Sequence, residues 1–363
     1  MRRAVERISN LAAKLTDKSR VSMRMFYGSC LANLRYRLNS RDYSMTATVG
    51  LAVTDAGQGV AYGDYFTALE LAAELEKAGL RVIYLRRHAG DWYCEAAKCE
   101  TVISLLESFN PEKIKSTDSQ SRPLCIAWAR NWFDRWREAK GIHSYDLLLA
   151  SSETAAAYLS SETGLNAELF PLATSAPRFY QKAGVTAYQR DLCFTGSYWY
   201  KPREIERLLD VSRLSNYRLD IFGENWENSE KFSSFWRGFL DYEALPEVYK
   251  TTKIVLDDAN FATKPYGAVN SRVYDALAAG ALVLTNGGLG AKETFNGLLP
   301  VYSSSEELHR QIDFYLSDEE ARLAKILELQ DFVLAQHTYA HRVTQLLKLL
   351  AQNKSLPDSR GGH

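Results

Sequence analysis

The sequence predicts an α/β protein of two domains, each a parallel sheet covered by helices on both faces. Its 363 residues exceed the length at which a single hydrophobic core usually divides into two. Apolar residues make up 46% of the chain, which is enough to fill a core in each domain. From Thr46 onward, short apolar runs alternate with amphipathic stretches, and this alternation is typical of parallel strands joined by helices.

The first domain is predicted from five apolar runs that have the length of strands. They lie at residues 46–53, 81–85, 101–106, 124–128 and 146–150. A loop with Gly57, Gly59 and Gly63 follows the first run, and an amphipathic helix is expected from residue 65 to 78. Proline and small residues between positions 170 and 178 indicate a connector to the second domain.

A second unit of the same kind follows the connector, so we expect two Rossmann-like, doubly wound domains that face each other across a cleft. Its strands are expected at residues 192–195, 219–222, 254–256 and 282–285. Its helices are expected at residues 202–209, 271–279 and 304–316. The last helical stretch, residues 319–350, has no strand after it, and a helix in that position can cross back to the first domain.

Composition and pattern divide the chain into five segments. They are a basic helical segment (1–45), a first Rossmann-like domain (46–175), a second (176–336), a crossing helix (337–352) and a disordered tail (353–363). Overall, 44 Lys and Arg residues balance 44 Asp and Glu residues, so no nucleic acid is expected as a partner.

The N-terminal segment is the exception to this balance. Residues 1–45 carry ten basic side chains against three acidic ones. A solvated helix or a connector in a larger assembly explains this excess, and so does peripheral contact with an anionic membrane. The chain has no apolar run of about 18 residues and no signal peptide, so we expect a cytoplasmic location, with contact at the inner membrane face left open.

Ligands of parallel sheets bind beyond the carboxyl ends of the strands, so the loops there hold the candidate site residues. In the first domain, residues 54–64 form such a loop, but its glycines do not have the spacing of a dinucleotide-binding fingerprint. Asp64 ends this loop and is a candidate general base. The alternative is that Asp64 caps the helix that follows it.

In the second domain, residues 257–280 are the richest in candidate side chains. Asn270 or Ser271 is expected to cap a helix, whose first backbone N–H groups would suit a diphosphate. Arg272 and Lys264 could add charge-assisted hydrogen bonds to phosphate, and Asp275 could accept hydrogen bonds from ribose hydroxyls. The alternative is that Arg272 and Asp275 form an ordinary surface pair three residues apart.

The sequence predicts no metal site. A DxD motif is missing, and the adjacent Asp257 and Asp258 would point to opposite sides of a strand end. His337 and His341 stand four residues apart, but no HExxH pattern accompanies them.

Four motifs in the second half of the chain resemble those of one enzyme family. Residues 272–285 resemble the "R-x-F-E-A-x-A-x-G" segment of the spore-maturation-protein-like branch of GT-B glycosyltransferases. Residues 194–197 resemble its "F-x-G-S" turn, residues 221–223 its "I-Y-G" strand end, and residues 337–342 its "H-T-Y-x-x-R" close. The motifs occur in the family's order and span about residues 191–342.

The resemblance implies a metal-independent GT-B enzyme that moves a sugar from a nucleotide diphosphate donor to a glycan or another hydroxyl acceptor. It implies a role in bacterial surface polysaccharide synthesis, with the nucleotide sugar as co-substrate and no other cofactor. Asp275 stands where the family has its ribose-binding acid, usually Glu, and Lys264 stands where the wider superfamily has a sugar-contacting Glu. These two departures leave the donor sugar open.

The candidate site residues lie on the two walls of the expected cleft. The expected donor-binding residues in the second domain are Gly196, Ser197, Lys201, Arg203, Lys264, Asn270, Ser271, Arg272 and Asp275. In the first, acceptor-binding domain we expect Gly59, Arg130 and Asn131 to contact the acceptor, with Asp64 or His143 as general base. Trp132 and Trp136 are expected to fill the core or the domain interface.

Two other functions fit the same fold plan, because fold alone does not determine chemistry. One is a nucleotide-sugar epimerase or a phosphorylase. The other is a catalytically silent scaffold domain that binds a sugar or a nucleotide within a larger assembly.

Overall fold

The computed structural model describes residues 47–90, 92–115, 122–183, 187–198 and 203–353. The predicted basic segment 1–45, the candidate Lys201 and residues 354–363 of the predicted tail lie outside the described residues. Among the residues described, no helix is long and apolar enough to span a membrane.

The first domain contains a sheet of six parallel strands in the order β2-β1-β3-β4-β5-β6. Its strands are β1 (Thr48–Val53), β2 (Arg81–Arg86), β3 (Thr101–Ser104), β4 (Leu124–Ala129), β5 (Leu147–Ala150) and β6 (Ala167–Leu169). Its helices are α2 (Gly63–Lys77), α3 (Trp92–Ala96), α4 (Phe133–Arg137) and α5 (Glu153–Thr163). The sequence predicted β1 to β5 but missed β6, a three-residue edge strand without a fully buried side chain.

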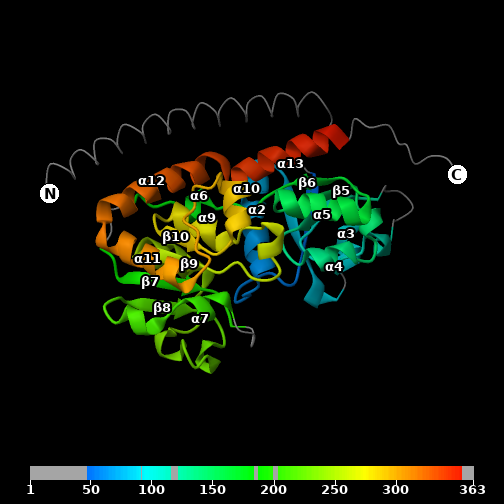
Figure 1. Cartoon of the computed structure of the whole chain (residues 1–363). Coiled ribbons are helices and arrows are strands. Elements are labelled where there is room, and N and C mark those ends of the chain that lie inside the picture. The colour runs from blue at the N-terminus through cyan, green and yellow to red at the C-terminus, as the bar shows by residue number, and fades with distance from the viewer. Residues whose placement is uncertain (1–46, 91, 116–121, 184–186, 199–202, 354–363) are drawn as a thin grey trace.

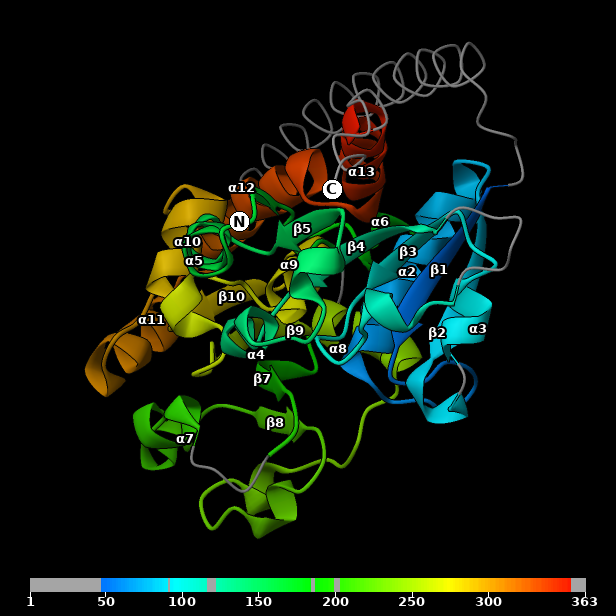
Figure 2. The same cartoon turned by 90° about the vertical axis from the view of Figure 1, so that its right-hand side faces the viewer.

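The second domain contains four parallel strands in the order β10-β9-β7-β8. They are β7 (Arg190–Thr195), β8 (Leu219–Phe222), β9 (Thr252–Asp257) and β10 (Leu282–Thr285). The helices of this half are α6 (Ala176–Phe179), α7 (Glu204–Leu208), α8 (Leu245–Lys250), α9 (Ser271–Ala278), α10 (Gly288–Phe295), α11 (Ser305–Ser317), α12 (Glu319–Gln336) and α13 (Tyr339–Asn353). Figures 1 and 2 show the two domains side by side, each with its own sheet.

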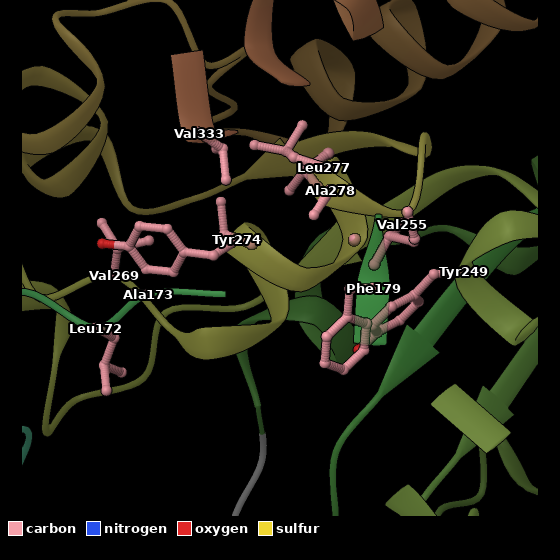
Figure 3. Packing of buried hydrophobic residues seen from close by; sticks show 14 of the residues in the cluster. Leu172, Ala173, Phe179, Tyr249, Val255, Val269, Tyr274, Leu277, Ala278 and Val333 are labelled. Atoms are coloured by element: carbon pink, nitrogen blue, oxygen red, sulfur yellow. The ribbon is translucent and has the colours of Figure 1, made fainter. Parts of the chain in front are cut away.

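Helix α9 is embedded in the core of the second domain. Six consecutive residues, from Val273 to Ala278, are buried. In Figure 3, Tyr274 and Leu277 of α9 lie in one apolar cluster with Val333 of α12 and Val255 of β9. Because close-packed cores tolerate little displacement, this packing fixes the position of the helix that carries Ser271, Arg272 and Asp275, three of the predicted donor-binding residues.

The predicted helical stretch 319–350 consists of two helices, and the second, α13, lies close to the bounds expected for the crossing helix (337–352). Between α12 and α13, Thr338 forms a parallel bridge with Thr174 of the connector. After this break, α13 packs against α2 of the first domain (Figure 1). The predicted crossing of the C-terminal helix back to the first domain is therefore confirmed.

Arg342 holds α13 against the connector between the domains. It is 5% exposed and donates hydrogen bonds to the carbonyl oxygens of Pro171 (2.7 Å) and Leu172 (3.4 Å). It also lies 2.7 Å from Nδ1 of His337. Burial and the charge of Arg342 lower the pKa of His337 to about 3, so the neutral ring accepts this hydrogen bond.

Replacing Arg342 with glutamine should lower the free energy of unfolding by about 2–4 kcal/mol, because two buried carbonyl groups would lose their charged donor. Urea unfolding measures the effect. The matched control is Lys348→Gln, the same change at an exposed position of the same helix, which should cost less than about 0.5 kcal/mol. Equal stability of the two variants would contradict this role of Arg342.

Candidate functional site

A cavity lies between the two domains, at the carboxyl ends of β7 and β8. Its lining comes from α2, from the ends of these two strands, from residues 239–249, from α9 and from the start of α13. The lining residues are Gly63, Phe66, Thr67, Thr195, Gly196, Ser197, Phe222, Gly223, Phe239, Leu240, Tyr242, Leu245, Tyr249, Ser271, Arg272, Asp275 and Tyr339. This is the edge at which parallel sheets bind their ligands.

Two glycines with positive φ angles let the ends of β7 and β8 approach each other. A Cβ atom on Gly223 (φ 136°) would lie 2.3 Å from the carbonyl oxygen of Gly196. A Cβ atom on Gly196 (φ 148°) would lie 2.8 Å from Nη2 of Arg272. Because a side chain fits at neither position, bare backbone forms this part of the cavity beside the guanidinium group of Arg272.

Two aspartates at the end of β9 hold the two arginines of the site. Asp257 and Asp258 are each 1% exposed. Oδ1 of Asp257 accepts a hydrogen bond from Nη1 of Arg272 at 2.8 Å, and Oδ2 of Asp258 accepts one from Nε of Arg203 at 2.7 Å. The guanidinium carbons of Arg272 and Arg203 lie 4.7 and 5.0 Å from the centroid of the Phe194 ring. The first residue of the "F-x-G-S" motif therefore supports both arginines by cation–π contact.

Every carboxylate oxygen of the two aspartates has a protein donor. Asn270 also donates to Oδ1 of Asp257, Thr285 donates to its Oδ2, and Asn286 donates to Oδ1 of Asp258. Burial raises the pKa of Asp258, and Arg203 opposes this shift. In the described part of the chain, no group of three or more His, Cys, Asp or Glu side chains could hold a metal ion.

The first turn of α9 faces the cavity without a side-chain cap. Asn270 precedes the helix as predicted, but its side chain binds Asp257 instead of a backbone N–H group of α9. Ser271, the first residue of the helix, is exposed and lines the cavity. The alternative surface pair of Arg272 and Asp275 is wrong, since Arg272 binds Asp257 and Asp275 binds Thr174.

Asp275 is buried at the boundary between the domains, with 6% of its surface exposed. Its Oδ1 accepts a hydrogen bond of 2.8 Å from the hydroxyl of Thr174 in the connector. Burial raises the pKa of Asp275 well above its usual value, the hydrogen bond from Thr174 opposes the shift, and the charge of Glu70 adds to it. The carboxyl group therefore tends to be neutral, so it can both donate and accept hydrogen bonds.

The other predicted donor-binding residues surround the same strand ends. Lys264 forms an ion pair of 2.5 Å with Glu204, so its charge is already balanced within the protein. The carbonyl oxygen of Ser197 accepts a hydrogen bond from Arg203 at 3.0 Å. The structure thus brings the described donor candidates together around β7, β9 and α9.

On the first-domain wall, Asp64 does not cap α2. The helix begins at Gly63, and Asp64 is its second residue, so the predicted cap is wrong. Its Oδ2 accepts a hydrogen bond of 2.5 Å from the backbone N–H of Thr54, just after β1. Asp64 lies half-buried between the cavity-lining Gly63 and Thr67 on the first turn of α2.

Arg130 is a buried cation behind this wall, with 9% of its surface exposed. It donates hydrogen bonds to the hydroxyl of Thr67 (3.1 Å) and to the carbonyl oxygen of Leu105 (3.3 Å). Its buried Nε has no hydrogen-bond partner. Burial lowers the pKa of Arg130, and the negative charge of Asp64 opposes the shift. Arg130 is thus positioned to act on Asp64 more directly than on a ligand in the cavity.

The remaining acceptor candidates are scattered. Gly59 lies in the exposed loop after β1, and Asn131 is half-buried just after β4. His143 is exposed in a short turn that precedes β5, and the neighbouring Ser144 is bound by Arg122 ahead of β4. His143 therefore lies at the amino ends of the strands, away from the cleft, and its prediction as a general base is wrong.

The two tryptophans expected in the core or at the domain interface take one of these places each. Trp136 is 1% exposed and fills the core. Trp132 is half-buried, and its ring meets that of Phe261 in the second domain.

Sequence reasoning missed several residues that shape the site. Phe66 of α2 stacks on Tyr242 with ring centroids 4.2 Å apart, across the cavity from Arg272. Asp257 and Asp258 were considered only as metal ligands. The structure pairs them with Arg272 and Arg203 instead. Tyr242 lies in an irregular segment that carried no pattern in the sequence.

Comparisons with known proteins agree with this geometry. Residues 203–348 match a family model described as glycosyl transferase-like. No curated protein sequence matches the chain. Among solved structures, Anabaena HepE in complex with UDP and glucose superposes with a TM-score of 0.60 at 10% identity, covering 84% of this chain and 100% of that one.

Two further structures show the same arrangement. An E. coli structure described as trehalose-6-phosphate bound with UDP-2-fluoro glucose gives a TM-score of 0.57 at 10% identity, covering 85% of this chain and 99% of that one. T4 phage BGT in complex with UDP and Mn²⁺ gives 0.55 at 11% identity, covering 86% and 99%.

The fold is therefore GT-B, with two facing Rossmann-like domains. The family match to residues 203–348 agrees with the predicted class, because this part of the chain is similar to glycosyl transferase-like proteins. The narrower spore-maturation-protein-like branch stays a prediction.

Proposed function

We propose that the chain transfers a sugar from a nucleoside diphosphate donor to a hydroxyl group of a glycan acceptor, with the donor bound in the cavity between the domains. One observation carries the proposal. Three features line this cavity together: the backbone at Gly196 and Gly223, which carries no side chain, the first turn of α9, which has no side-chain cap, and the guanidinium group of Arg272. This combination offers directional donors to a diphosphate and room for it to approach.

The diphosphate would bind between the β7 turn and α9. Backbone N–H groups of the first helical turn have no intrahelical acceptor, and the helix dipole favours negative charge there. Arg272 keeps one terminal nitrogen directed at the space beside Gly196, while its other terminal nitrogen binds Asp257. Asp275, one turn further along, would hold ribose hydroxyls through its neutral carboxyl group.

The donor nucleotide is proposed to be uridine diphosphate, because the similar structures named above contain UDP or a UDP sugar. Metal independence is also a proposal. It is supported by the four saturated carboxylate oxygens of Asp257 and Asp258, although the T4 phage complex contains Mn²⁺. The motif resemblance supports a cytoplasmic role in bacterial surface polysaccharide synthesis.

The donor assignment predicts that Ser271→Pro weakens UDP binding by roughly 10- to 100-fold, the scale of one hydrogen bond to a charged group. Proline is tolerated at the first position of a helix, and Asn270 has the extended backbone (φ −68°, ψ 148°) that a residue before proline requires. The substitution therefore removes one N–H donor while the helix is kept. Isothermal titration with UDP, in EDTA, measures the loss.

The matched control is Ser305→Pro, the same change at the first position of α11, which should leave UDP affinity unchanged. Thermal shifts with UDP-, GDP-, dTDP- and CMP-sugars identify the preferred nucleotide. Unchanged affinity in a folded Ser271→Pro variant would remove α9 from the donor site. Binding that requires added metal would overturn metal independence, and binding without nucleotide release would favour a silent scaffold.

For the acceptor, we propose Asp64 as the general base of an inverting transfer. The acceptor oxygen would attack the anomeric carbon, the bond from that carbon to the diphosphate oxygen would break, and the hydroxyl proton would pass to Asp64. Arg130 would act as a positioning residue, because it donates a hydrogen bond to Thr67, one turn after Asp64 on α2, and so holds this part of the helix in place. The hydrogen bond from Thr54 fixes one oxygen of Asp64 and leaves the other for the proton.

Asp64→Asn should lower turnover by about 10²- to 10⁴-fold with little change in UDP affinity, because an amide cannot take the proton at neutral pH. Asparagine can still accept the hydrogen bond from Thr54, so a fold close to the native one is expected. The matched control is Asp55→Asn in the same loop, whose carboxylate bonds locally to Ala56. Near-native turnover of Asp64→Asn would show that the base lies elsewhere or that the enzyme retains configuration.

A further inference from the structure

Trp132 has a backbone conformation that bulky side chains rarely adopt. Its φ and ψ angles are 51° and 45°, in the left-handed region. The neighbours Arg130 and Phe133 are both buried and hold the chain in place on either side. Strained residues persist where the surrounding structure fixes them, and they cluster at ligand sites. Trp132 follows β4, at the edge of the first sheet that faces the second domain.

Phe261 projects from the opposite domain toward Trp132. The two ring centroids are 5.3 Å apart with an interplanar angle of 71°. Phe261 is nevertheless 56% exposed. Its turn is held by Asn260, whose side-chain oxygen accepts a hydrogen bond from the N–H of Ala262 and whose carbonyl oxygen accepts one from the backbone N–H of Lys264. A fixed turn of the second domain thus presents an exposed aromatic ring beside Trp132 of the first domain.

We propose that Trp132 and Phe261 form a subsite for a pyranose ring of the glycan acceptor, an inference that rests on the proposed function. The apolar face of a pyranose packs on an aromatic ring, while its hydroxyl groups need polar partners. Such partners flank both rings. Asn131 precedes Trp132, Asn260 precedes Phe261, and the guanidinium carbon of Arg135 lies 4.0 Å from the centroid of a Trp132 ring.

The position of the pair favours the acceptor over the donor sugar. Neither ring is among the residues that line the cavity with Gly196, Arg272 and Asp275, where the donor is proposed to bind. Trp132 belongs to the first domain, which the GT-B plan assigns to the acceptor, and Asn131 beside it was already an acceptor candidate. The subsite would hold a saccharide unit that both domains contact.

Saturation-transfer difference NMR tests the subsite, with methyl glucopyranoside, galactopyranoside and mannopyranoside as probes in the presence of saturating UDP. In the wild-type protein, at least one probe should receive saturation. Phe261→Ala should reduce that signal roughly three- to tenfold, the scale of an aromatic contact, and Phe261→Tyr should retain it. The matched control is Phe314→Ala on α11, which removes another exposed phenylalanine (49%), one that contacts Tyr315.

Three results would overturn the subsite: no probe signal in the wild-type protein, equal signals in wild type and Phe261→Ala, or an equal loss in Phe314→Ala. Weaker binding of UDP-glucose relative to UDP in Phe261→Ala, with an unchanged probe signal, would assign the ring to the donor sugar and also overturn the proposal. Failure of the proposed function is seen separately, as absence of UDP binding and of UDP release by the wild-type protein.

Discussion

The ion pair between Asp257 and Arg272 is the interaction on which the site depends. The carboxylate is 1% exposed, and the two side chains meet at 2.8 Å where the end of β9 faces the start of α9. Removing one member of a buried pair leaves an uncompensated charge, which is strongly destabilising. The pair therefore fixes the orientation of Arg272, and through it the shape of the cavity beside Gly196. The second pair, Asp258 with Arg203, repeats this arrangement one residue further along the strand.

This arrangement changes how a diphosphate would be bound. The two arginines are matched by two aspartates and Lys264 by Glu204, so these groups have no net charge. Electrostatic attraction summed over the cluster is therefore weak, and affinity would come from directional hydrogen bonds at the start of α9 and from Arg272. A preorganised set of donors of this kind also stabilises charge that develops on a leaving group.

The two walls of the cleft are joined by buried contacts close to the cavity. Thr174 of the connector binds Asp275, and Arg178 forms an ion pair with Glu70 of α2. Arg178 also lies over the ring of Tyr242, which stacks on Phe66. Since Asp275 and Tyr242 both line the cavity, a ligand there would contact the groups that hold the domains together. Arg342 extends this connection to α13.

The sequence predicted the strands and helices that have a regular apolar pattern. It missed features that depend on contacts between residues far apart in the chain. The buried run at residues 282–285 was predicted with the bounds of β10, because three apolar residues and a threonine between turn signals indicate a buried strand. The crossing helix was expected from residue 337, but the bridge from Thr338 to Thr174 that separates α12 from α13 was not predicted, because Thr174 is far away in the sequence. The donor candidates were found from their motifs. The sequence did not predict which groups these candidates bind. The fold decides which strand ends lie together, and therefore which charged groups meet.

A crystal structure with bound UDP tests the central claim most directly. The account predicts that the diphosphate lies beside Gly196, with one phosphate oxygen within hydrogen-bond distance of the first-turn N–H groups of α9 and another near Arg272, while Arg272 still contacts Asp257. The ribose should meet Asp275. A diphosphate bound elsewhere, with the first turn of α9 and Arg272 making no contact to it, would contradict the account.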